Sequence, residues 1–164
     1  MIQDFDSQLQ VSLRALEEVV APALAGAEKH VVEQFMLSIA TIRFVKTRMS
    51  EARRFYRMEL RSCIGLARVA ARIAGEDALI ADAVQAGEAA LTDPEADIAD
   101  FESASRRLRD RLTALSHAAV GSPHQAALEA TILEKCGALL DQHRQWCTPF
   151  GFELQPENLP HPAW

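Results

Sequence analysis

The sequence lacks long apolar runs and an excess of basic residues. No uninterrupted apolar stretch approaches the roughly 20 residues that a membrane-spanning helix needs. The formal charge is −6, from 17 basic and 23 acidic residues. This argues against a dedicated nucleic-acid binder, because such affinity comes largely from neutralised phosphates. Residues 1–6 carry acids where a secretory signal carries positive charge. We therefore expect a soluble, cytoplasmic protein that binds neither membranes nor nucleic acids.

Motifs of common catalytic and metal sites are also missing. There is no glycine-rich phosphate loop, no GxSxG turn and no Glu-x-x-His pair of the kind that builds di-metal sites in helical bundles. The one reverse pair, His30 and Glu33, cannot enclose a metal by itself. Cys63, Cys136 and Cys147 lack CxxC spacing and lie in apolar helical patterns, which indicates buried, reduced thiols. We predict no catalytic residues, no metal and no cofactor, and we favour a protein that is not an enzyme. An active site built from scattered residues would leave no such motif.

The sequence does have strong helical patterning. Its 164 residues, 49% hydrophobic and 24% charged, match the size and balance of one globular domain. Apolar residues recur every three or four positions from Phe5 to Val20, which predicts a first helix that ends at Pro22 and Gly26. The predicted fold class is all-α. We expect an antiparallel bundle of four to five helices over residues 1–151, followed by an extended, proline-rich tail over residues 152–164.

The second helix is expected to be very long. Residues 27–74 contain no proline and only Gly65 among glycines, and their apolar positions keep one helical phase. A continuous helix of that length would extend about 72 Å, longer than a compact domain of this size. Either the helix breaks near Met49 and Ser50, where Ser50 could cap a new helix, or one half projects and needs a partner to cover it. The sequence leaves both alternatives open.

Three further helices follow. Residues 77–91 predict a short helix with a small-residue surface, which we interpret as peripheral. Asp93 and Pro94 form a strong start signal for the next helix, since aspartate caps and proline fits the first turn. That helix has an apolar seam of the kind found in bundles. The seam consists of Ile98, Phe101, Ser105, Leu108, Leu112, Leu115 and Ala119.

The last predicted helix begins after Gly121, Ser122 and Pro123 and runs to about Cys147. Its expected inward residues are Leu128, Ile132, Leu133, Cys136, Leu139, Leu140 and His143. The tail that follows contains Phe152, Leu154, Leu159 and Trp164. These apolar side chains favour docking of the tail, on its own bundle or on a neighbouring subunit, over free disorder.

Charge is segregated along the chain. Residues 43–72 contain nine basic residues and two acids, a net of +7, whereas residues 76–102 contain nine acids and no base. The simplest interpretation is that the acidic helix folds back beside the basic one, which reduces the repulsion within each.

Within the basic block, five arginines share one helical stripe, with Tyr56 nearby. These are Arg54, Arg57, Arg61, Arg68 and Arg72. Guanidinium groups bind phosphates and carboxylates through paired hydrogen bonds, so the stripe is a candidate surface for an anion or for an acidic partner. Solvation of an exposed face is the alternative. Among the histidines, His143 is a candidate polar site at the edge of the core, because Leu139, Leu140 and Trp146 surround it on the helix.

The stretch Leu16-Glu17-Glu18-Val19-Val20-Ala21-Pro22-Ala23-Leu24, followed by Gly26 and His30, resembles the opening of a family of small uncharacterised bacterial helical proteins. The resemblance covers roughly residues 9–75. It implies a genomic setting beside acyl-CoA dehydrogenases and aminoglycoside-phosphotransferase-like kinases. The family defines no catalytic residues, so none is transferred to this chain.

Two hypotheses of function follow. The first is a non-enzymatic protein-interaction module, a homodimer or a partner-binding protein, that uses its long helix. The second is an accessory protein that binds an anionic small molecule, such as acyl-CoA or a nucleotide, through the arginine stripe and a cavity in the bundle.

Overall fold

The computed structural model describes residues 4–164, so residues 1–3 of the acidic N-terminal stretch lie outside the described part. The described residues form helices and turns, with no strand among them, which confirms the all-α fold class. They fall into two compact units. The first unit comprises Met1–Ser50 and Arg144–Leu159, and the second comprises Glu51–His143 and Pro160–Trp164. A single cooperative domain over residues 1–151 stays a prediction.

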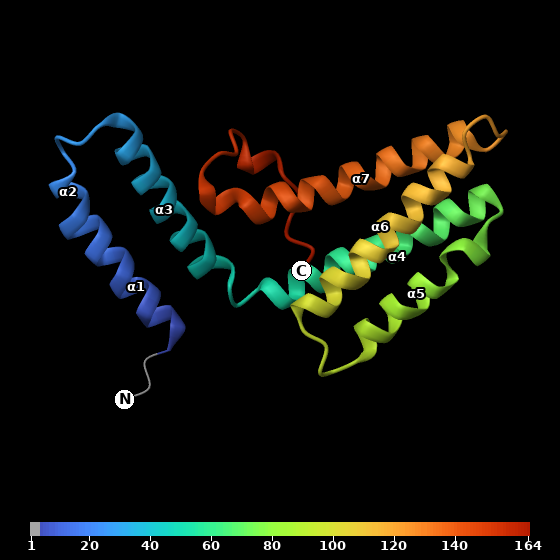
Figure 1. Ribbon diagram of the computed structural model, residues 1–164, viewed down its shortest axis with the longest axis horizontal. Helices are drawn as coiled ribbons and strands as arrows, with labels where there is room; N and C mark the ends of the chain where they lie inside the picture. The colour runs from blue at the N-terminus through green and yellow to red at the C-terminus, as the bar shows by residue number, and fades with distance from the viewer. Residues whose placement is uncertain (1–3) are drawn as a thin grey trace. The chain divides into compact units, whose positions relative to one another are not determined.

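The first unit is built on a helical hairpin. Its first arm consists of α1 (Phe5–Ala15), a π-helical turn (Leu16–Val20) and α2 (Ala21–Ala23). The Asp4 side chain caps α1 by accepting a hydrogen bond from the Ser7 amide at 2.8 Å. The chain then turns and returns antiparallel as α3 (Lys29–Arg48), as Figure 1 shows. The predicted first helix is therefore confirmed, with Pro22 inside its last turn.

The long second helix is broken. Helix α3 ends at Arg48, and α4 (Ala52–Ala74) begins after a turn at residues 49–51. Of the two alternatives left open by the sequence, the break near Met49 and Ser50 is therefore correct. The expected cap is not: Glu51 occupies the N-cap position, and its side chain makes no capping hydrogen bond.

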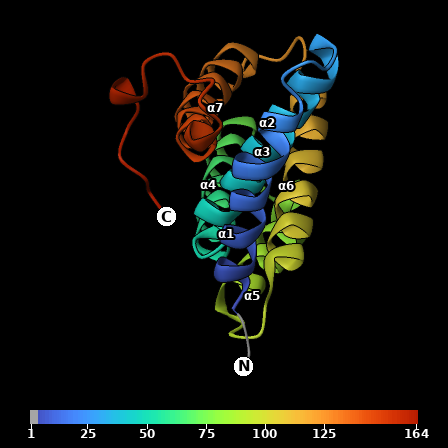
Figure 2. The same ribbon diagram turned by 90° about the vertical axis from the view of Figure 1, so that its left-hand side faces the viewer.

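The second unit is an up-and-down arrangement of α4, α5 (Asp77–Thr92), α6 (Ile98–Ala118) and α7 (Gln125–Cys147), of which α7 belongs to this unit up to His143. Successive helices run antiparallel (Figures 1 and 2). Gly75 ends α4 in the left-handed conformation, φ 71°, which glycine adopts without steric cost. The predicted antiparallel bundle is confirmed.

The core of this unit lies among α4, α5 and α6. Leu60, Phe101, Leu108 and Leu115 are completely buried. The seam predicted on α6 is confirmed, because all of its members are buried except Ile98, which is half-buried. The interpretation of α5 as peripheral is wrong. Its small residues let it approach α4 closely: a Cβ atom added at Gly87 would lie 3.0 Å from the Ile64 side chain.

Helix α6 begins four residues later than predicted. Asp97, not Asp93, is its N-cap. The Asp97 side chain accepts from the Asp100 amide at 3.1 Å, and Asp100 accepts from the Asp97 amide at 2.9 Å. This reciprocal pair satisfies two helix-end amides, which a single cap at Asp93 cannot do. Asp93 instead accepts a hydrogen bond from the Glu95 amide, at 2.9 Å, in the preceding turn.

Helix α7 packs along a narrower stripe than predicted. Leu128 is buried, and Ile132 and Leu139 pack against the core. Leu133 and Leu140, expected to face inward, are 74% and 59% exposed. Leu133 directly follows Ile132, and Leu140 directly follows Leu139. Consecutive residues are rotated by about 100° around a helix, so when Ile132 and Leu139 face the core, the residues after them face away from it. Of the three cysteines, only Cys63 is buried, whereas Cys136 and Cys147 are exposed.

The end of the tail docks on its own chain. Trp164 packs against Phe55 with ring centroids 5.3 Å apart. Gln142 of α7 donates to the His161 carbonyl at 3.3 Å and accepts from the Ala163 amide at 2.9 Å. The tail also contains a short 3₁₀ turn, Pro156–Asn158, and is not extended throughout. Leu154, expected to dock, is 93% exposed.

Candidate functional site

The predicted arginine stripe lies on α4, where the neighbouring helix α5 engages part of it. Arg57 donates to the Leu91 carbonyl at 2.9 Å, and Arg68 forms an ion pair with Glu88. Arg53, one position before the stripe, donates to the Ala96 carbonyl at 3.1 Å. These arginines therefore hold the end of α5 and the turn after it. The part of the basic block on α4 therefore lies beside the acidic helix α5, as the charge pattern indicates.

The remaining arginines of the stripe are Arg54, Arg61 and Arg72. Within residues 4–164 none of the three has a hydrogen-bond or ion-pair partner, and all three are exposed. Tyr56, the stripe's aromatic neighbour, is half-buried. Burial raises its pKa, and the nearby Glu102 and Glu59 carboxylates raise it further, so the hydroxyl stays protonated at neutral pH. The anion-binding role of the stripe stays a prediction.

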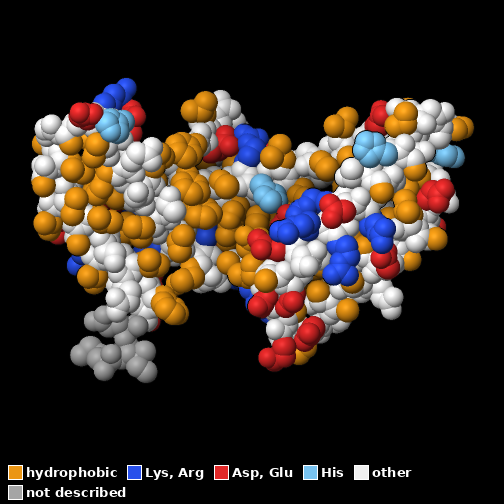
Figure 3. All heavy atoms as spheres, in the orientation of Figure 1, with side chains coloured by type: hydrophobic (Ala, Val, Ile, Leu, Met, Phe, Trp, Pro, Cys, Tyr) orange, Lys and Arg blue, Asp and Glu red, His pale blue; other side chains and the backbone are white. Residues whose placement is uncertain are grey.

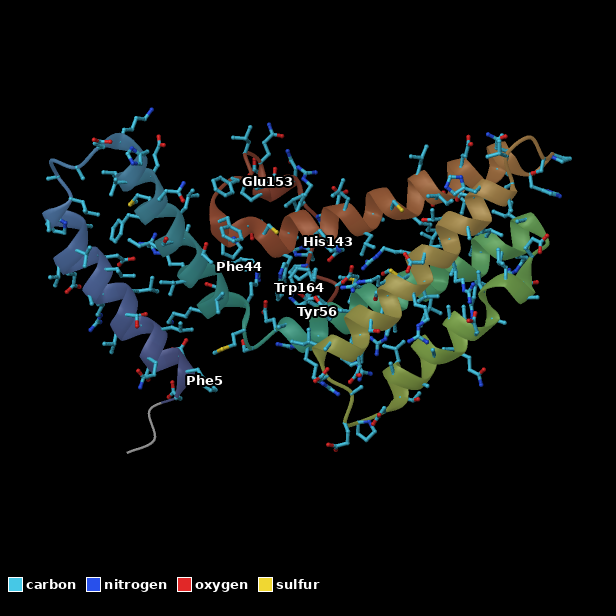
Figure 4. The ribbon with its side chains drawn as sticks, viewed as in Figure 1. Phe5, Phe44, Tyr56, His143, Glu153 and Trp164 are labelled. Atoms are coloured by element: carbon cyan, nitrogen blue, oxygen red, sulfur yellow. The ribbon has the colours of Figure 1, made fainter. Side chains whose placement is uncertain are left out.

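His143 belongs to a polar cluster that ties three helices together. Glu59 of α4 accepts a hydrogen bond from Arg109 of α6 at 2.8 Å. The Nε2 atom of His143, on α7, lies 3.6 Å from the same carboxylate oxygen. The His143 ring also packs edge-on against Phe55, at 5.2 Å between centroids. Figure 4 shows His143, Tyr56 and Trp164 close together around this point.

The three side chains of this cluster differ in their exposure to solvent. The Glu59 side chain is only 8% exposed, whereas those of Arg109 and His143 are 50% and 39% exposed. The interaction with His143 is the main cause that lowers the pKa of Glu59; burial opposes it and Arg109 adds to it. Glu59 is therefore an ionised, nearly buried carboxylate that accepts a hydrogen bond from Arg109 and has His143 as a second polar neighbour. Removing either neighbour would leave the buried charge less compensated, so the cluster links the packing of α4 to that of α6 and α7.

The thiol beside this cluster is poorly suited to act as a nucleophile. Cys63 lies one helical turn after Glu59 on α4 and is 3% exposed. Burial raises the pKa of its thiol, and the Glu59 charge raises it further, although Arg109 and Ser105 oppose them. A protonated thiol is a poor nucleophile. In residues 4–164 no group of three or more His, Cys, Asp or Glu side chains could hold a metal ion.

Sequence reasoning found His143 but missed Glu59 and Arg109. A signal for Glu59 was present: it is one of two acids in the basic block, and it lies three residues after Tyr56 and four before Cys63, on the apolar phase of α4. An acid on a buried face requires a partner. Arg109 left no such signal, because it follows the fully buried Leu108 among several charged residues of α6.

The first unit contains a separate apolar groove of about 480 Å³. It is lined mainly by Val32, Met36, Leu37 and Ala40 of α3 and by Phe150 and Phe152. Phe150 stacks on Phe44 at 4.4 Å and on Phe152 at 6.0 Å between centroids. Next to Phe152, Glu153 accepts two hydrogen bonds from Arg144, at 2.9 and 3.0 Å. The groove therefore has a wall of ordered aromatic rings.

Comparison of the chain with known protein families, curated proteins and solved structures finds no match. No helix of the described part is long and apolar enough to cross a membrane.

Proposed function

We propose that the protein is a non-enzymatic helical interaction module that self-associates through the apolar surface of its first unit. The observation behind this proposal is that few apolar side chains of the first unit are buried. In the described part of this unit the buried apolar residues are Leu13, Ile39 and Trp146. A hairpin with so few buried side chains cannot offset the entropy cost of its own ordering.

Large apolar side chains remain exposed on the same unit. Figure 3 shows apolar side chains gathered over α1 and α3 on the face in view. Soluble monomers rarely expose large contiguous apolar patches, and such patches mark interaction surfaces. The exposed residues are Phe5, Val11, Val19, Val20, Val31, Met36, Leu37, Val45, Met49, Phe152 and Leu154.

A second copy of the chain is the partner that this surface fits best. Charged side chains of the hairpin already pair with one another: Arg43 lies 2.6 Å from Glu17, and Lys46 lies 3.0 Å from Asp6. A partner that covers the exposed apolar residues must offer apolar side chains of its own, and the same residues of a second copy meet this requirement. Two antiparallel hairpins packed face to face form a four-helix bundle, and a two-fold axis presents the same face from both copies.

Mass measurement tests this proposal. We expect the native chain to be a dimer in light scattering coupled to size-exclusion chromatography. The double variant Met36→Glu, Leu37→Glu places two charges on the surface and should yield a monomer, because unpaired charges resist burial. Val120→Glu is the matched control, since Val120 is 68% exposed but belongs to the second unit.

A native chain that stays monomeric at the highest measurable concentration would overturn the proposal. A dimer that survives both the double variant and Phe152→Glu would overturn the surface assignment. Circular dichroism on each variant separates loss of association from loss of folding.

A cytoplasmic location is part of the same proposal. Cys63, Cys136 and Cys147 are all free thiols, which is the usual state of cysteines in reducing compartments.

A further inference from the structure

The second unit contains an apolar groove that the proposed self-association does not use. It has a volume of about 360 Å³ and lies between α6 and α7, with α4 beneath. This volume is within the range of small-molecule sites. All of its lining residues belong to the second unit.

The two sides of the groove differ in chemistry. Helices α4 and α7 supply apolar or weakly polar side chains, namely Cys63, Leu66, Ile132, Cys136 and Leu139. Helix α6 supplies Leu112 and four polar side chains, namely Arg109, Thr113, Ser116 and His117. A ligand that fills this groove must therefore be amphipathic, with one apolar side and at least one hydrogen-bond acceptor.

The positive charge of Arg109 favours a negatively charged acceptor on the ligand. One of its terminal nitrogens donates to Glu59 at 2.8 Å, and among the described residues its other N–H groups have no acceptor. Glu59 has a second neighbour in His143, at 3.6 Å, so it does not depend on Arg109 alone. Half of the Arg109 side chain is exposed. A guanidinium with spare donors at the rim of an apolar groove suits a carboxylate, which can accept two of them.

We propose that the groove between α6 and α7 binds an apolar carboxylic acid, with its hydrocarbon part against Leu66, Ile132 and Leu139 and its carboxylate on Arg109. The proposal rests on groove shape and on the donors of Arg109, and it is independent of how many chains associate.

Isothermal titration calorimetry with octanoate and with octan-1-ol tests the ligand class. The two probes share an apolar chain and differ in the carboxylate. We expect octanoate to bind, and to bind more tightly than octan-1-ol by about tenfold or more, because hydrogen bonds to charged groups are the stronger ones. Equal affinities, or no heat from millimolar octanoate, would overturn the proposal.

A pair of neighbouring variants tests the location. Ile132→Trp fills the groove and should abolish octanoate binding. Leu133→Trp makes a change of similar size at the next residue, which is 74% exposed and does not line the groove, and should leave binding unchanged. Binding that survives Ile132→Trp, or that both variants remove while circular dichroism shows them folded, would overturn the site.

The same samples separate this site from the self-association. Octanoate binding is measured as heat and oligomeric state as mass, so each can fail while the other holds. A monomer that binds octanoate would support the groove and overturn only the dimer.

Discussion

Trp164 donates its indole N–H to the Glu51 carboxylate at 3.2 Å, across 113 positions of sequence. Its ring packs edge-on against Phe55 at 5.3 Å between centroids. Phe55 in turn contacts His143 and Tyr56. One aromatic residue of the tail is thus joined to the start of α4 and to the polar cluster.

This contact predicts that Trp164 stabilises the second unit. Trp164→Ala should lower the free energy of unfolding by about 1–3 kcal/mol, below the range for fully buried tryptophans because the ring is half-buried. Trp164→Phe keeps an aromatic ring and loses the N–H donor, so it should cost about 1 kcal/mol. Urea unfolding followed by circular dichroism measures both. Equal losses would show that the ring contact contributes nothing.

The lowered pKa of Glu59 should make the stability of the protein depend on pH. Because the pKa of Glu59 is lowered in the folded state, its contribution is complete above the ordinary carboxyl pKa and disappears as pH falls through the lowered value. The difference in unfolding free energy between the native protein and Glu59→Gln should therefore shrink on acidification. Urea unfolding at a series of pH values measures it. The control is Glu134→Gln, whose side chain is 74% exposed. A difference that stays constant into strong acid would contradict the assignment.

The glycines of α4 and α5 should respond in opposite ways. Gly65 is exposed, and a Cβ added there meets nothing within 4 Å, so Gly65→Ala should stabilise by about 0.5–1 kcal/mol. Gly87 is buried against Ile64 and Leu60, with added-Cβ distances of 3.0–3.3 Å. Gly87→Val overfills this contact and should destabilise by about 1–3 kcal/mol. Thermal melts of the two variants give the comparison; a stabilised Gly87→Val would contradict the close packing of α5 on α4.

The hydrogen bonds of Arg48 should stabilise the C-terminal end of α7. Its guanidinium donates to the Gln145 and Trp146 carbonyls, both at 2.9 Å, and lies 5.2 Å from the Trp146 ring centroid. Arg48→Lys keeps the charge but not the planar set of donors, so it should cost about 1–2 kcal/mol. Urea unfolding gives the cost, and Trp146 fluorescence should report a more exposed ring. Unchanged fluorescence and stability would argue against this role.

Much of the fold follows from local patterning. The seam on α6 was predicted residue by residue, because its members recur at helical spacing on one face, which packs against α4 and α5. Helix α7 shows where the apolar pattern is ambiguous: it has apolar residues at 132 and 133 and again at 139 and 140. Periodicity cannot choose between adjacent stripes, whereas packing against α4 and α6 can. The predicted start of α6 was wrong for a related reason. Asp93 and Asp97 are both suitable N-cap residues, but only Asp97 has an acidic partner three residues later, Asp100.

The candidate sites depend on pairs that are distant in sequence. Glu59, Arg109 and His143 lie on three helices, and no spacing rule connects them. His143 was found because its own helix surrounds it with apolar residues. Arg109 acquires its role only when α4 places a buried carboxylate opposite it. The arginine stripe differs: its spacing was evident and the charge pattern indicated an acidic helix beside it, but the individual contacts of Arg57 and Arg68 with α5 were not predicted.

The wide turn at Leu16–Val20 determines where the end of the first arm points. A π-helical turn accommodates one residue more than an α-helical turn, which offsets every later side chain by about 100° around the axis. Leu13, before the turn, is buried, whereas Val19 and Val20 are exposed. Val20 follows Leu13 by seven positions, a spacing that a regular α-helix places on one face, so the wide turn is what directs Val20 outward.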